Sequence, residues 1–90
     1  MCRNIKTLFN FDPPATEEEI RAASLQFVRK LSGFTAPSKV NEEAFDLAVK
    51  EVSDVAERLI ASLVTSAPPR DREEWAARAR ARAAERYSRA

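Results

Sequence analysis

The chain has 90 residues, of which 44% are hydrophobic and 32% are charged, and its net charge is only +1. It contains no His, one Cys and one Gly, which excludes imidazole catalysis, an internal disulfide and Gly-rich phosphate loops. No apolar run approaches the ~20 residues that span a membrane, and the start lacks the apolar stretch of a secretory signal. We therefore expect a single cytoplasmic domain that uses no metal or other cofactor.

Proline and glycine divide the chain into four segments, with breaks at Pro13-Pro14, residues 33–37 and Pro68-Pro69. The first segment, residues 2–11, is ambiguous. Ile5, Leu8 and Phe9 fit one turn of a helix, whereas positions 5, 7, 9 and 11 alternate as in a strand. Because a lone strand would find no partner elsewhere in this chain, we predict a short helix docked on the core.

The second segment predicts a helix that begins after Thr16. Thr16 and Glu19 have the spacing of a capping box, in which each side chain accepts a hydrogen bond from the backbone N–H of the other residue. Gly33 suits the left-handed position that follows the last turn of a helix. The apolar face of this helix consists of Ile20, Ala23, Ser24, Phe27, Val28 and Leu31.

The third segment predicts a longer helix over residues 42–65, with Asn41 as its N-cap and Pro68 beyond its end. Its apolar stripe consists of Phe45, Ala48, Val49, Val52, Ala56, Leu59 and Leu63. Val55 and Ile60 widen the stripe, which suggests contact with two neighbours. If Val55 and Ile60 remain exposed, the stripe becomes a homodimer face.

The fourth segment, residues 73–89, consists mostly of Ala, Arg and Glu and predicts a helix by propensity, with Trp75 as its anchor. The expected fold is all-α: a small bundle with a short N-terminal helix, two core helices and a basic C-terminal helix. We treat residues 1–90 as one domain, with residues 1–69 as the core and residues 70–90 as the Arg-rich helix.

Charge is distributed unevenly along the chain. Residues 70–90 hold seven Arg against four acids, a net +3, whereas residues 1–69 hold eight bases against ten acids, a net −2. The stripe Arg78, Arg82 and Arg86 lies on one helix face, and with Trp75 it is our hypothetical binding surface. This surface suits a protein partner or a second copy of the chain. Two other interpretations remain: the arginines could bind nucleic-acid phosphates, or they could form a solvated face with intrahelical Glu–Arg pairs.

No catalytic constellation is visible, so we expect a non-catalytic protein. Cys2 offers an alternative, because removal of Met1 would leave a terminal thiol beside Arg3 and Lys6, whose charges favour the thiolate. The chain has no His to act as its base. The acidic clusters at helix starts are explained by the helix dipole and predict no metal site.

Several short blocks, in order and spacing, resemble a family of small bacterial proteins catalogued as a domain of unknown function. These blocks are MCRNIK at 1–6, PPAT at 13–16, SGF at 32–34, PSK at 37–39, NEEAF at 41–45 and APPR at 67–70. The resemblance covers nearly the whole chain and implies a complete bacterial domain. It carries no activity, substrate or catalytic residue.

A weaker likeness is to the J-domain of co-chaperones, whose second helix opens with a similar Ala-Thr-x-Glu-Glu-Ile pattern. Ala15, Thr16, Glu18, Glu19 and Ile20 match it. The His-Pro-Asp loop of that family is replaced here by residues 33–37, without any His. We therefore expect no stimulation of a chaperone ATPase.

Overall fold

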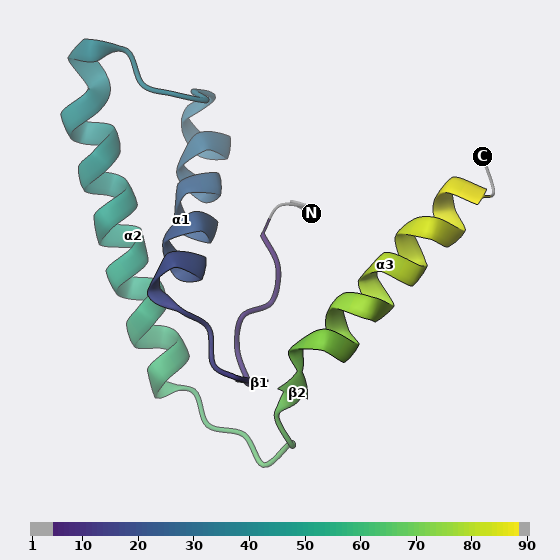
Figure 1. Ribbon diagram of the computed structural model, residues 1–90. Coiled ribbons are helices and arrows are strands. Elements are labelled where there is room, and N and C mark those ends of the chain that lie inside the picture. The colour runs from purple at the N-terminus through teal and green to yellow at the C-terminus, as the bar shows by residue number, and fades with distance from the viewer. Residues whose placement is uncertain (1–4, 89–90) are drawn as a thin grey trace.

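The structure, a computed structural model, describes the backbone of residues 5–88 and the side chains of residues 5–86. Its elements are β1 (Phe11–Asp12), α1 (Glu17–Ser32), the 3₁₀ turn η1 (Lys39–Asn41), α2 (Glu42–Ser62), β2 (Arg70–Asp71) and α3 (Arg72–Ser88) (Figure 1). Most of the described chain is helical, which confirms a small, mostly helical protein. Over the described residues, no helix is long and apolar enough to cross a membrane.

Helix α1 begins and ends at the predicted residues. The Glu19 N–H donates to Thr16 Oγ1 at 3.2 Å, and the Thr16 N–H donates to Glu19 Oε1 at 3.0 Å, so the capping box is complete. Gly33 follows the last turn with φ 78°, and its N–H donates to the Arg29 carbonyl at 2.9 Å. Both ends of α1 are therefore fixed by local chemistry.

Helix α2 begins at the predicted residue but ends earlier than predicted. Asn41 occupies the predicted N-cap position, but its side chain donates to Ser38 Oγ at 2.9 Å and makes no capping hydrogen bond, because η1 already leads the backbone into α2. The helix ends at Ser62, three residues earlier than predicted, where the chain turns extended at Leu63. The Thr65 hydroxyl accepts from the Ala67 N–H, so residues 65–67 form a local turn instead of continuing the helix.

Helices α1 and α2 form an antiparallel hairpin that contains the core (Figure 1). Val28, Phe45 and Val49 are buried between the helices, with Leu25, Ala48 and Val52 packed against them. Ser24 is also buried, and its hydroxyl donates to the Ile20 carbonyl at 2.8 Å, so its polar group is satisfied.

The outer part of the predicted α2 stripe has no second neighbour. Val55 and Leu59 are each 56% exposed, whereas Ile60 is half-buried. Among the described elements, α2 packs on α1 and on η1, which leads into it, so the second neighbour that the widened stripe suggested is not found at Val55 and Leu59. A homodimer face was expected only if both Val55 and Ile60 remained exposed, and of these two residues only Val55 is exposed.

Residues 5–10 form no helix and residues 11–12 form strand β1, so the prediction of a short helix is wrong for the described residues. Strand β1 pairs in parallel with β2, Phe11 opposite Arg70. Asn10 adopts φ 65°, which Asn tolerates better than most residues, and accepts from the Arg70 N–H at 2.8 Å. Its side chain donates to the Pro68 carbonyl at 3.2 Å. A helix was predicted because no partner for a strand was visible in the sequence, but residues 70–71, just after the Pro68-Pro69 break, supply that partner.

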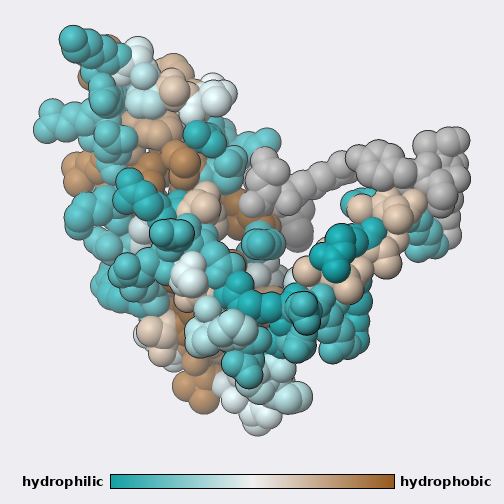
Figure 2. All heavy atoms as spheres, in the orientation of Figure 1, coloured by the Kyte–Doolittle hydropathy of each residue, from teal (hydrophilic) through white to brown (hydrophobic). Residues whose placement is uncertain are grey.

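Helix α3 diverges from the hairpin as a separate arm (Figure 1). The Asp71 carboxylate accepts from the Glu74 N–H at 2.8 Å and caps its start. The radius of gyration is 15.8 Å, whereas a compact chain of this length would have about 12 Å. In Figure 2 the arm shows hydrophilic and weakly hydrophobic surface, separated from the body by a hollow.

Candidate functional site

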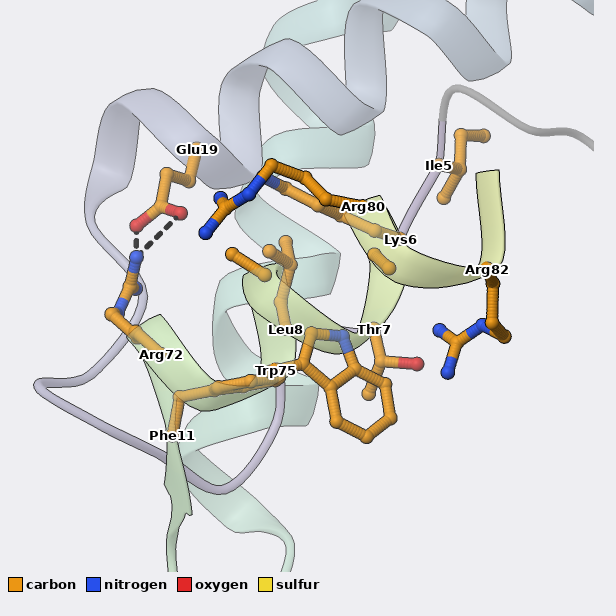
Figure 3. Close-up of a pocket in the computed structure, with 12 residues that line it drawn as sticks. Ile5, Lys6, Thr7, Leu8, Phe11, Glu19, Arg72, Trp75, Arg80 and Arg82 are labelled. Atoms are coloured by element: carbon orange, nitrogen blue, oxygen red, sulfur yellow. Dashed lines mark hydrogen bonds and ion pairs between the residues drawn. The ribbon is translucent and has the colours of Figure 1, made fainter. Parts of the chain in front are cut away.

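An ion pair joins the first turns of α1 and α3. Arg72 donates from two guanidinium nitrogens to the Glu19 carboxylate, at 2.6 and 2.9 Å (Figure 3). Its Nε donates to the Pro13 carbonyl at 2.6 Å. Because Arg72 and then the Thr16 N–H donate to it, the pKa of Glu19 is lowered from 4.5 to about 2. The same carboxylate thus completes the α1 cap and holds the start of α3.

A second contact joins α3 to the N-terminal segment. The rings of Phe11 and Trp75 meet edge to face, with centroids 5.7 Å apart and an interplanar angle of 82°. The Arg70 guanidinium lies 5.6 Å from the Phe11 centroid and 5.1 Å from the Trp75 centroid, and it donates to the Phe9 carbonyl at 3.1 Å. Each cation–π contact at such a site contributes about 0.5–1 kcal/mol. Trp75 therefore connects α3 to β1.

A cleft of about 650 Å³ adjoins these two contacts, between the N-terminal segment and α3 (Figure 3). We call it the arm cleft. Its apolar lining consists of Ile5, Leu8, Phe11, Trp75, Ala76 and Ala79. Its polar and charged lining consists of Lys6, Thr7, Glu19, Arg72, Arg80 and Arg82. A volume of this size falls within the ~300–1,000 Å³ range of small-molecule sites.

The structure brings together only some of the predicted site residues. Trp75 and Arg82 line the arm cleft, whereas Arg78 pairs with Glu74 at 2.5 Å and is not part of the lining. Arg86 is exposed one turn beyond Arg82. The proposed thiol at Cys2 lies outside the described residues.

Lys6, Leu8 and Arg80 were missed as site residues by the sequence interpretation. The strand-like alternation of residues 5–11 was the available signal for the first two, but it named no partner. Arg80 is not part of the predicted stripe of Arg78, Arg82 and Arg86, but it lines the cleft together with the N-terminal segment. Within the part of the chain that the structure describes, no group of three or more His, Cys, Asp or Glu could hold a metal ion.

Over residues 1–78, the sequence matches the family described as uncharacterized conserved proteins, DUF2277. The chain belongs to this family. The match confirms the resemblance to a domain of unknown function, and no curated protein or solved structure matches the chain. The matched range includes the hairpin, the N-terminal segment and the base of α3, whereas Arg80, Arg82 and Arg86 lie beyond it.

Proposed function

We propose that the protein is a non-catalytic cytoplasmic binding module that holds an acidic protein partner along α3. The observation that supports this most is the exposure of the arm: from residue 77 to residue 86, every side chain except Ala83 is exposed. Isolated helices of about 12–15 residues are marginal in water, and helices in proteins are stabilised mostly by packing an apolar face. A 17-residue helix that buries so little in its own chain is suited to a surface on a partner.

The charge of the arm indicates the partner's chemistry. Arg78, Arg82 and Arg86 recur at intervals of four residues and form what we call the arginine face. Glu74 offsets part of the charge of Arg78, whereas Arg82 has no acceptor among the described residues. Acidic side chains of a partner would supply the missing acceptors through charge-assisted hydrogen bonds.

Nucleic acid is the second candidate for the same face, because arginines at helical spacing also suit phosphates. Proteins that bind single strands add several aromatic platforms. Among the described side chains of α3, Trp75 is the one aromatic ring, and it is engaged by Phe11 and Arg70. These contacts favour the acidic protein partner.

Fluorescence anisotropy with a labelled deca-glutamate peptide tests the proposed function. Wild-type protein should bind the peptide with an affinity that falls as salt rises from about 0.05 M to about 0.2 M. Replacing the arginine face, R78Q/R82Q/R86Q, should abolish this binding. A matched control removes three exposed cations from the hairpin, as R21Q/K30Q/R58Q.

Equal peptide binding by the two triple variants contradicts the proposed function, because net charge alone would then explain it. Duplex DNA of matched charge serves as the competing probe. If DNA binds more tightly than deca-glutamate and loses affinity in R78Q/R82Q/R86Q, the nucleic-acid candidate replaces the protein partner. For the alternative at Cys2, mass spectrometry shows whether Met1 is removed, and a thiol pKa at its ordinary value of about 8.5 rejects a reactive group.

A further inference from the structure

The arm cleft has an unbalanced charge. Four cations, Lys6, Arg72, Arg80 and Arg82, line it against the single carboxylate of Glu19, a net +3, although the whole chain carries only +1. Glu19 is already occupied by Arg72 and by the Thr16 N–H. The one carboxylate in the lining is therefore already used, and it does not pair with Lys6, Arg80 or Arg82.

Lys6, Arg80 and Arg82 have no hydrogen-bond or ion-pair partner among the described residues. They approach the cleft from two elements: Lys6 comes from the N-terminal segment, and the two arginines come from α3 (Figure 3). Like charges that share one concave surface repel each other, and the field they create attracts an anion. A doubly charged anion would offset most of the charge of these three groups.

The floor of the same cleft is apolar. Leu8 and Trp75 are half-buried in it, and Ala76 and Ala79 contribute methyl groups from α3. An inorganic ion would leave this surface in contact with water. A ligand with an apolar group attached to its charged head would cover the floor while its head meets the cations.

We propose that the arm cleft binds a small phosphate monoester, with its phosphate between Lys6 and Arg80 and its apolar or aromatic group against Leu8 and Trp75. This inference rests on the proposed function, because Arg82 belongs both to the cleft and to the arginine face. It adds a ligand class and a location, since Lys6 and Arg80 lie outside that face. The phosphate oxygens accept charge-assisted hydrogen bonds from the guanidinium and ammonium groups.

Trp75 provides the readout, because it is the single Trp of the chain and lines the cleft. Phenyl phosphate is titrated into the full chain while Trp fluorescence is recorded, with calorimetry as a second measurement. Inorganic phosphate tests the head alone and phenol tests the apolar group alone. Phenyl phosphate should bind at least about tenfold more tightly than either fragment.

The variants Lys6→Gln and Arg80→Gln should each weaken phenyl phosphate binding about tenfold, because each removes a charged donor. Arg58→Gln is the matched control: it removes one exposed cation from α2, and Arg58 neither lines the cleft nor belongs to the arginine face. It should bind phenyl phosphate within about twofold of wild type. Circular dichroism verifies that each variant keeps its helix content.

Three results would overturn this proposal. The first is no binding of either phenyl phosphate or vesicles that contain phosphatidic acid, and the second is equal weakening of phenyl phosphate binding in Arg58→Gln and Lys6→Gln. The third is binding to phosphatidylcholine vesicles doped with phosphatidic acid without binding to phenyl phosphate, which would assign the monoester to a lipid headgroup. If the wild-type protein still binds deca-glutamate in any of these cases, only the cleft proposal is rejected. If it binds phenyl phosphate as predicted but does not bind deca-glutamate, only the proposed function is rejected.

Discussion

Replacing Glu19 with Gln tests how the arm is attached to the hairpin. The substitution keeps the shape of the side chain but removes the charge that accepts two hydrogen bonds from Arg72 and one from the Thr16 N–H. Since the same carboxylate completes the α1 cap and holds the first turn of α3, both contacts weaken together. We expect a less stable protein in which Trp75 is more exposed to solvent.

The magnitude follows from the pKa of Glu19, which is lowered from 4.5 to about 2. At ~1.36 kcal/mol per pKa unit, a shift of this size corresponds to about 3 kcal/mol. The Glu19 and Arg72 side chains remain 23% and 32% exposed, so solvent screens part of their attraction. We therefore expect Glu19→Gln to lower the free energy of unfolding by about 1–2 kcal/mol, and the melting temperature by about 4–8 °C per kcal/mol.

The pH dependence of this difference is specific. Because the pKa of Glu19 is depressed in the folded state, its contribution is complete above the unfolded value of 4.5 and is lost as the pH falls toward about 2. Urea unfolding followed by circular dichroism should show a constant gap between wild type and Glu19→Gln from about pH 8 to about pH 5, which closes toward about pH 2. Trp fluorescence reports on α3 in the same samples.

Glu18→Gln is the matched control, since Glu18 is an exposed acid in the same first turn and loses only a helix-dipole interaction of about 0.3–1 kcal/mol. If the two variants are equally stable at neutral pH, the Arg72 ion pair does not hold the arm. A gap that persists unchanged at about pH 2 would likewise refute the electrostatic explanation.

Three further substitutions, and a fourth that serves as a control, test the fold by thermal or urea unfolding. Val49→Ala should cost about 2 kcal/mol, because Val49 is 3% exposed in the core, whereas Val64→Ala, at a position 95% exposed, should cost nothing measurable. Gly33→Ala should cost about 1 kcal/mol through its positive φ alone, since no atom lies within 4 Å of the added Cβ. Asp71→Ala should remove the α3 cap at a cost of about 1 kcal/mol and reduce the helical circular dichroism signal. Equal stability of the Val49 and Val64 variants, or an unchanged Asp71 variant, would contradict the packing and capping described here.

The local features of the fold could be predicted from the sequence because their interactions connect near neighbours. The capping box joins Thr16 to Glu19, and Gly33 closes the helix onto Arg29, so each signal lies within four residues. Phe45 and Val49 were likewise predicted from helical spacing and are buried. Helix length was predicted less well, because the local turn at Thr65 competes with one more turn of α2.

The arrangement of the N-terminal segment could not be predicted in the same way. Asn10 meets Pro68 and Arg70 across nearly sixty residues of sequence, and nothing in residues 2–11 identifies that partner. The arm cleft depends on this pairing. Trp75 and Arg82 could be predicted from their positions on one helix. Lys6 lies at the cleft only because β1 pairs with β2, and that pairing could not be predicted.

The central claim is that the binding surface lies on α3 and the facing N-terminal segment, and not on the exposed apolar side of the hairpin. A titration of ¹⁵N-labelled full chain with deca-glutamate, followed by amide chemical shifts, tests it most directly. We predict that the largest shifts fall on residues 78–86, with smaller ones on residues 5–8. Shifts concentrated around Leu31, Val55 and Leu59, with α3 unchanged, would contradict the claim and place the binding surface on the hairpin.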